Sequence, residues 1–332
     1  MVMKATEPRD FVFSLFGISC DAAELDLKPD YSKSHHAVLI ETATAIISSG
    51  TLEILTLAKG SNKSLPSWVP DWSSEIGHNL QHGPWSTSLG ISDNFFSLDT
   101  PRPSLDLRPY MACRGIKQNS QVITASGDGL SLSISVILLD SVEHIFGSGI
   151  IYKSINDDLL QLWDELYNAA RTTGSSELPY HNLGDAVFRL LTLDRERVDS
   201  RGLWNICRAR EEFLSSAQKV FILWRDTYSR NPPVEFWDTL KKDVILDLFT
   251  LTSRTVNVGR RPFVTKQGWL GMGLERMIEG DIVAIIAGAD VPFILRADEH
   301  GHHRLIAEAY FQGLMDGEAA EMGLPVLDID LY

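Results

Sequence analysis

The sequence predicts an α+β fold: a small antiparallel β-barrel or sandwich with a long helical insertion and an N-terminal helical segment. Three observations predict it. Apolar residues alternate with serines over residues 130–136, apolar residues recur at helical spacing within 157–250, and strand-length apolar runs follow from residue 255 onward. Strands, then helices, then strands indicate α+β rather than alternating α/β architecture.

These patterns divide the 332 residues into four segments. The segments are an N-terminal helix with an irregular Trp- and Pro-rich stretch (1–110), a β-hairpin (111–150), the helical insertion (151–250) and the C-terminal β-barrel segment (251–332). We expect the hairpin to pair with the C-terminal strands, so that the helical block is an insertion into one barrel.

An amphipathic helix is expected between Ser34, which can cap its start, and Gly50, which can end it. Five residues share its apolar face: Leu39, Thr42, Ala43, Ile46 and Ile47. His35 and His36 open this helix, and we expect them on its exposed side.

The stretch "LPSWVPDWS", residues 65–73, holds two tryptophans between prolines. Its characteristic residues are Pro66, Trp68, Pro70, Asp71 and Trp72. The tryptophans could form a stacking wall for a small molecule, but a packed corner in which an indole N–H finds Asp71 as acceptor is the favoured interpretation. Residues 74–110 show no sustained period and are expected to be irregular and at the surface.

The strictest alternation belongs to the hairpin, where Leu130, Leu132, Ile134 and Val136 are separated by single serines, which predicts a strand. The insertion follows with apolar residues at helical spacing in residues 156–170, including Trp163, and the pattern returns in 183–192, 210–225 and 234–250. These stripes indicate core-facing helices. The last segment shows strand-length runs separated by turn residues such as Gly280 and Gly288.

Composition excludes several functional classes. The formal net charge of −14 argues against a broad phosphate-binding surface, so no nucleic-acid partner is expected. Apolar runs stay well short of a membrane span, and the first residues show no leader pattern, which makes a cytoplasmic protein with no membrane partner the default. Three widely spaced cysteines, Cys20, Cys113 and Cys207, suggest buried free thiols rather than disulfides.

Motifs for cofactors and catalysis are not found. The glycines of "GWLGMG" (268–273) are expected to form a tight turn, because no helix signal follows them as in a phosphate-binding loop. The cluster His300, His302 and His303 is interpreted as a polar hairpin tip, so no metal and no cofactor are expected. Acidic pairs such as Asp328 with Asp330 do not identify catalytic residues by spacing alone.

Several motifs in a fixed order resemble a known family. "EPRDFVFSLFGIS", "PDYSKS", "LEILTLA", "LPSWVPDWS", "RRPFVTKQGWLGMG", "GDIVAIIAGADVPFILR" and "AEAYFQGLMDGEA" resemble the region after the HET domain in fungal heterokaryon-incompatibility proteins. The resemblance runs from Glu7 to Ala319 and implies a C-terminal small β-barrel. It also implies that the HET domain, a TIR-like effector region, is missing, and that "LPSWVPDWS" is a scaffold element. One departure is Ala307, where the family tends to carry glycine.

Two functional hypotheses follow. The first is a HET-family regulatory or recognition module in fungal self/nonself recognition, with a protein partner. The alternative is a biosynthetic-cluster enzyme, free of cofactor, that cyclises or rearranges a hydrophobic small molecule in a pocket beside the barrel. The candidate pocket residues for the alternative are Trp269, Arg296, Tyr310 and Asp316, although each also fits a purely structural role. The catalytic residues are unknown on either hypothesis.

Overall fold

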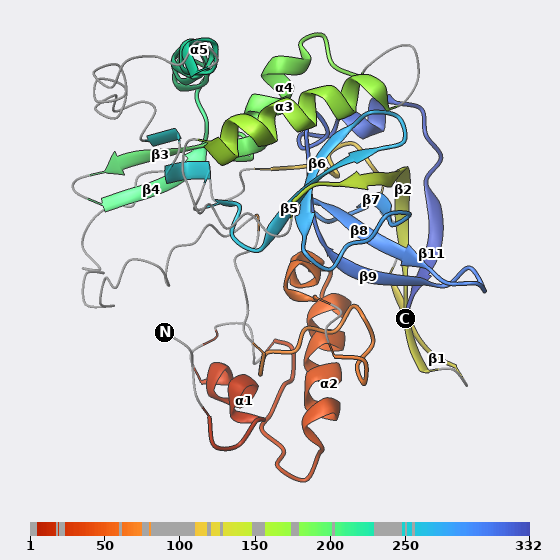
Figure 1. Cartoon of the computed structure of the whole chain (residues 1–332). Helices are drawn as coiled ribbons and strands as arrows, with labels where there is room; N and C mark the ends of the chain where they lie inside the picture. Colours follow the sequence, from red (N-terminus) through yellow and green to blue (C-terminus); the bar gives the residue numbers. More distant parts are fainter. Residues whose placement is uncertain are drawn as a thin grey trace.

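A computed structural model gives the fold, and it confirms the α+β class and the antiparallel barrel (Figure 1). The residues that the structure describes are 5–17, 19, 24–59, 62–74, 80, 110–117, 121–126, 129–147, 157–173, 179–200, 203–228, 248–249, 251–253 and 256–332. Of the stretch expected to be irregular, 74–110, only residues 74, 80 and 110 lie within these ranges, as do only a few residues of the expected helix 234–250.

A nine-stranded sheet forms the body of the described chain. Its strands are β1 (Val122–Ser126), β2 (Gly129–Ile145), β5 (Arg260–Thr265), β6 (Leu270–Leu274), β7 (Ile282–Ile286), β8 (Pro292–Ala297), β9 (His303–Glu308), β10 (Tyr310–Phe311) and β11 (Leu327–Leu331). The order is β10-β6-β5-β2-β11-β9-β8-β7, with β1 paired to β2 beside this path, and β7 pairs again with β2, which closes a ring. The pairings are antiparallel except that of β11 with β9. Closure protects the strand edges that an open sheet would expose.

Strand β2 connects the hairpin to the C-terminal strands. At Val136 it pairs with Leu327 of β11 and with Ile286 of β7, and Val142 pairs with Thr265 of β5. The register shifts in the pairings with β7 and β5 are β-bulges, which let so long a strand bend around the barrel. Strand β2 thus pairs with three strands of the C-terminal segment, β5, β7 and β11.

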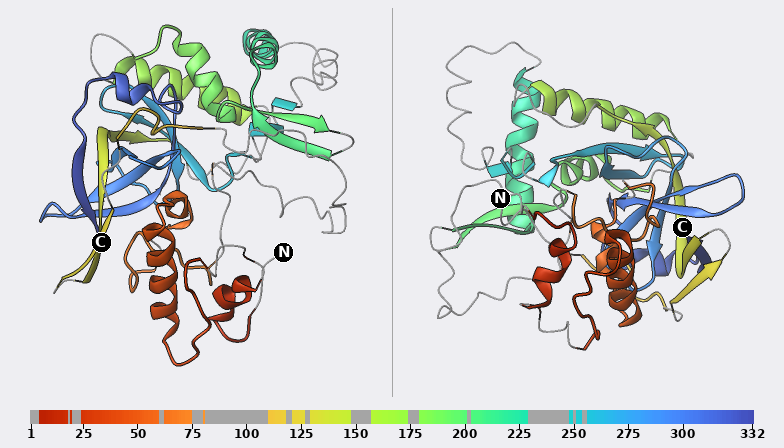
Figure 2. Two further views of the ribbon diagram at one scale, coloured as in Figure 1. Left: turned by 180° about the vertical axis from the view of Figure 1, so that it is seen from behind. Right: turned by 90° about the horizontal axis from the view of Figure 1, so that it is seen from below.

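Helices cover the two ends of the sheet (Figures 1 and 2). At one end lie α1 (Asp10–Phe16), α2 (His35–Ser48) and the 3₁₀ helix η1 (Glu53–Leu57); at the other lie α3 (Asp157–Thr172), α4 (Leu183–Thr192) and α5 (Glu211–Tyr228). A further 3₁₀ turn, η3 (Glu318–Glu321), precedes β11. The predicted cap of α2 is confirmed, because Ser34 Oγ accepts a hydrogen bond from the Ala37 N–H. The expectation that His35 lies on the exposed side of this helix is wrong, because both of its ring nitrogens are buried. None of these described helices is long and apolar enough to cross a membrane.

Two local expectations were incomplete or wrong. The helical insertion contains a hairpin that the periodicity did not predict, β3 (Arg195–Ser200) paired with β4 (Leu203–Arg208). In "GWLGMG" only Gly268 lies in a turn, with φ of +85°, whereas Gly271 and Gly273 belong to β6. A Cβ at Gly271 would lie 2.1 Å from Phe263 Cζ, so this glycine makes room for a core ring rather than for a turn.

Candidate functional site

The corner formed by residues 65–73 fastens the barrel at Ser67. The Ser67 N–H donates to the carbonyl of Tyr332 at 2.9 Å, and its Oγ accepts from the Leu305 N–H at 2.9 Å. Ser67 is buried, and Trp68 beside it is completely buried in the core. The corner thus joins β9 to the end of β11.

The expected partnership between Asp71 and an indole N–H is wrong for Trp68. The Asp71 carboxylate accepts instead from Asn62 Nδ2 at 3.1 Å and from the N–H and hydroxyl of Ser73. Trp68 Nε1 is buried without a hydrogen-bond partner. Together these contacts hold the turn and lower the pKa of Asp71, despite partial burial that acts in the opposite direction.

Two of the four candidate pocket residues, Tyr310 and Asp316, lie near Arg208 and the side chains that it contacts. Arg208 donates to Asp316 through Nη1 and Nη2, at 3.2 and 2.8 Å, and through Nε to Asp194 Oδ2 at 2.8 Å. Tyr310 lies edge-on to Tyr110, whose ring carries the Arg208 guanidinium 5.2 Å from its centroid. Burial raises the pKa of the Tyr310 phenol well above its ordinary value. Arg208 therefore connects β4 of the insertion to the barrel.

The same group of contacts includes an unusual backbone turn. Leu193 and Asp194 both adopt positive φ, 53° and 54°, a region that non-glycine residues rarely visit. The Leu193 carbonyl accepts from the Tyr110 hydroxyl at 2.6 Å, and Asp194 also accepts from Arg189 at 3.1 Å. Such a strained backbone conformation is kept only where several surrounding contacts hold it in place. Here the ion pairs of Asp194 do so.

The other two candidates occupy different surroundings. Trp269 is half-buried, stacks on Phe311 with ring centroids 5.8 Å apart, and meets Tyr180 edge-on. Arg296 lies on β8 and forms a two-point ion pair with the buried Asp281, at 2.7 and 2.9 Å. The four side chains thus do not line one common cavity within the described structure.

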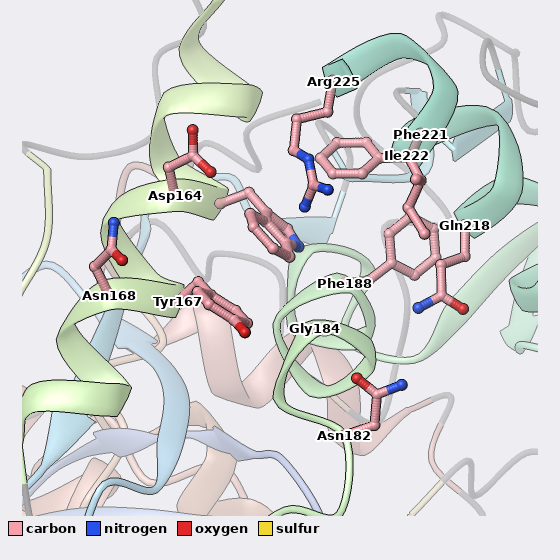
Figure 3. Close-up of a pocket in the computed structure, with 11 residues that line it drawn as sticks. Asp164, Tyr167, Asn168, Asn182, Gly184, Phe188, Gln218, Phe221, Ile222 and Arg225 are labelled. Carbon is pink, nitrogen blue, oxygen red and sulfur yellow. The ribbon is translucent and has the colours of Figure 1, made fainter.

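A pocket of about 490 Å³ lies elsewhere, between α3, α4 and α5 of the insertion (Figure 3). We call it the helical groove. Its lining residues are Trp163, Asp164, Tyr167 and Asn168 of α3, Asn182, Gly184 and Phe188 at α4, and Gln218, Phe221, Ile222 and Arg225 of α5. The aromatic members were correctly predicted to lie on core-facing stripes, but the groove itself was not predicted, because it exists only where three helices meet.

Aromatic rings form the inner wall of the helical groove. Trp163 stacks on Tyr167, with centroids 4.8 Å apart and 13° between the ring planes, and the Arg225 guanidinium lies 4.7 Å from the Trp163 centroid. Phe188 and Phe221 meet edge to face at 5.6 Å. Gly184 keeps this wall open, because its α-carbon faces the Trp163 ring and carries no side chain. The inner wall is thus apolar and is held in place by contacts within the core.

Other chemistry-bearing groups do not assemble in the described part of the chain. No set of three His, Cys, Asp or Glu side chains there could hold a metal ion. Asp298 accepts from the N–H groups of His300 and His302, so the histidine cluster does form a polar hairpin tip. Cys113 and Cys207 are not joined in a disulfide and are half-buried rather than buried, and Cys20 lies outside the described residues.

Comparison with known proteins confirms the resemblance found in the sequence. Residues 236–323 match the Het-6 beta-barrel domain. The chain is also similar to "Heterokaryon incompatibility protein 6, OR allele" from Neurospora crassa, with 27% identity over 352 aligned residues that cover 95% of this chain and 49% of the relative. The chain therefore spans about half the length of that curated relative. No solved structure matches it significantly.

The domain match covers β5 to β10, with Tyr310 and Asp316, but not the strand that closes the barrel. Strand β2, which pairs with β5, β7 and β11, precedes the matched residues. The helical groove also lies before the match, in the inserted helices. The barrel of this chain is thus completed by residues far upstream of those that match the Het-6 beta-barrel domain.

Proposed function

We propose that this chain, which carries a Het-6 barrel domain and is a distant homologue of an incompatibility protein, is a recognition module in fungal self/nonself recognition. The observation that supports the proposal is the similarity over 95% of the chain to a protein named for heterokaryon incompatibility. The module acts through contacts with a partner protein, and the barrel serves as the scaffold for the inserted helices.

The structure favours recognition over conversion of a metabolite. Arg208 with Asp316 and Arg296 with Asp281 form ion pairs between parts of the fold, and Tyr310 is buried. Side chains that pair with one another in this way stabilise the fold. The helical groove, by contrast, has an open side and a mixed aromatic and polar lining, as binding surfaces do.

Pairings of fungal strains test this function. Strains that carry different alleles of the gene are fused, once with the gene intact and once with it deleted from both partners. We expect poor growth or death of the fused cells when the gene is present and normal growth when it is deleted. Equal growth in both pairings would contradict a role in incompatibility.

A further inference from the structure

We propose that the helical groove binds a segment of a partner protein by taking up one aromatic side chain that lies next to a basic residue. This proposal rests on the proposed recognition function and names the site and chemistry of the contact. The first observation that supports it is the location of the groove. The groove lies between α3, α4 and α5 (Figure 3) and is partly open.

The inner wall suits an aromatic anchor. Trp163, Phe188 and Phe221 are each more than nine-tenths buried, so their positions are fixed by the core before any partner arrives. Aromatic rings prefer offset or edge-to-face contacts with other rings, and such walls are typical of the pockets that receive the dominant side chain of a partner. A preformed wall also lowers the entropic cost of binding.

The rim suits the peptide groups beside that anchor. Asn168, Asn182 and Gln218 each place a carboxamide at the groove. The Oδ1 atom of Asn182 accepts from the Asp185 N–H as the cap of α4, so the amino group of its amide is the part that can donate to a ligand. Carboxamides match the donors and acceptors of a polypeptide backbone.

The charges at the rim favour a basic neighbour for the anchor. The positive charge of Arg225 is opposed by Asp226, which accepts from it at 3.0 and 3.2 Å. Asp164 lines the groove and is exposed on α3, with the exposed Glu165 next to it, whereas the exposed Arg171 lies over the Tyr167 ring further along the same helix, so the acidic end of the groove is that of Asp164. A lysine or arginine of the partner would complement these carboxylates, chiefly by steering the encounter.

An apolar patch continues the groove along α5. Ile222, which lines the groove, is 41% exposed, and the adjacent Leu223 is 58% exposed. Exposed apolar groups next to a polar rim are a common mark of protein contact surfaces. A polypeptide can cover both the groove and this patch, whereas a small molecule within the groove would leave Leu223 in water.

Selection of random peptides displayed on phage against the full chain tests the proposal. We expect enriched sequences to carry Trp, Tyr or Phe beside Lys or Arg, and replacement of that aromatic residue by leucine to weaken binding about tenfold or more. Enrichment of no sequence class, or of one without an aromatic residue, would overturn the proposal. Equally tight binding of N-acetyltryptophanamide alone would also overturn it, in favour of a small-molecule site.

Two variants place the contact in the groove. Gly184→Leu fills the groove, and its Cβ meets only ordinary contacts, 3.4 Å from Asn182 Oδ1 and 3.5 Å from Trp163 Cζ2. Ile222→Lys places a cation at an exposed rim position and does not depend on that packing. Both should abolish binding of the selected peptide, while Gly17→Ala at the end of α1, with open space around its Cβ, serves as matched control. Unchanged binding to both variants would overturn the proposal.

The two proposals can fail separately. If no groove-dependent peptide is found but deletion of the gene still abolishes the incompatibility of paired strains, only the groove proposal is wrong. If peptides bind the groove and deletion changes nothing in the paired strains, the proposed function is wrong and the groove remains a protein-binding site.

Discussion

Arg260 and Glu308 form an ion pair that is almost completely buried within the barrel. Arg260 Nη2 lies 2.5 Å from Glu308 Oε1, and the two side chains are 1% and 2% exposed. The Glu308 carboxylate also accepts from the Leu80 N–H at 2.8 and 2.9 Å. One carboxylate on β9 therefore holds both β5 and the chain at residue 80.

Removal of this carboxylate should be among the most destabilising single changes in the barrel. Glu308→Gln leaves the Arg260 charge buried without its counter-ion, and we expect a loss of about 3–5 kcal/mol in the free energy of unfolding, measured with urea. The double variant Arg260→Met with Glu308→Met should lose less than the sum of the two single variants. Glu299→Gln at the exposed hairpin tip is the control, and an equal effect there would contradict the prediction.

Ser67 makes a second testable contribution to the barrel. Ser67→Ala removes the acceptor of the buried Leu305 N–H, and an unsatisfied buried donor costs about 1–3 kcal/mol. Thermal or urea unfolding should show that loss. Ser64→Ala in the same loop is exposed and should stay within about 0.5 kcal/mol of the unchanged protein. Equal stability of the two variants would show that Ser67 does not fasten the corner.

The fit between Gly271 and Phe263 predicts an asymmetry between two neighbouring glycines. Gly271→Ala forces a methyl group into the Phe263 ring, and we expect overpacking to cost about 1–3 kcal/mol. Gly273→Ala meets the flexible end of Met277, with Sδ 2.7 Å from the new Cβ, so a smaller loss is expected. Phe263→Leu in the Gly271→Ala background should recover part of the stability. Without such recovery, backbone effects rather than the ring would be the cause.

The elements that the sequence predicted well have a strong local period. The serine alternation in β2 and the apolar stripes of α2 and α3 result from repeated contacts on one face, and these three elements are present. The β3–β4 hairpin escaped prediction because its first strand, RERVDS, is rich in charged residues and shows no apolar alternation. Arg195 and Glu196 are nevertheless buried, at 3% and 1% exposure, through tertiary contacts that no local pattern records.

The candidate sites show more clearly that local sequence patterns do not predict tertiary contacts. Tyr310 and Asp316 were singled out on β-segments, yet their partner Arg208 comes from the insertion. The helical groove depends on Gly184 facing Trp163 across two helices, a relationship between residues whose spacing carries no periodic signal. Resemblance to a family predicted the barrel, and only the assembled helices reveal the groove.

His35 predicts a pH dependence of stability. Burial lowers the pKa of His35, although Asp71 and Glu7 oppose the effect, and both ring nitrogens are buried without hydrogen-bond partners. Because the folded state favours the neutral ring, its contribution is complete above the unfolded pKa of about 6.5 and is lost as the pH falls through that value toward the lower folded pKa.

The variant His35→Met should remove this part of the pH dependence. We expect urea unfolding between pH 8 and pH 5 to show a flatter stability profile for the variant than for the unchanged protein. The two profiles should differ most at the acidic end, where the unchanged protein has to protonate the buried ring or open around it. Parallel profiles over the whole range would contradict the assignment to His35.

Arg208 should couple the inserted helices to the barrel, because its guanidinium joins Asp194 beside α4 to Asp316 after β10 and lies over Tyr110. Arg208→Ala removes these charge-assisted bonds, and we expect a loss of about 2–3 kcal/mol. Lysine cannot reproduce the paired contacts, so Arg208→Lys should recover little of the lost stability.

Hydrogen exchange in the Arg208→Ala variant should accelerate first in α4 and the β3–β4 hairpin, where Leu193 and Asp194 hold a strained turn, and later in β7 and β8. Arg304→Ala, an exposed change on β9, is the control. If exchange accelerated equally in all these elements, Arg208 would stabilise the fold as a whole without being the link between its two parts.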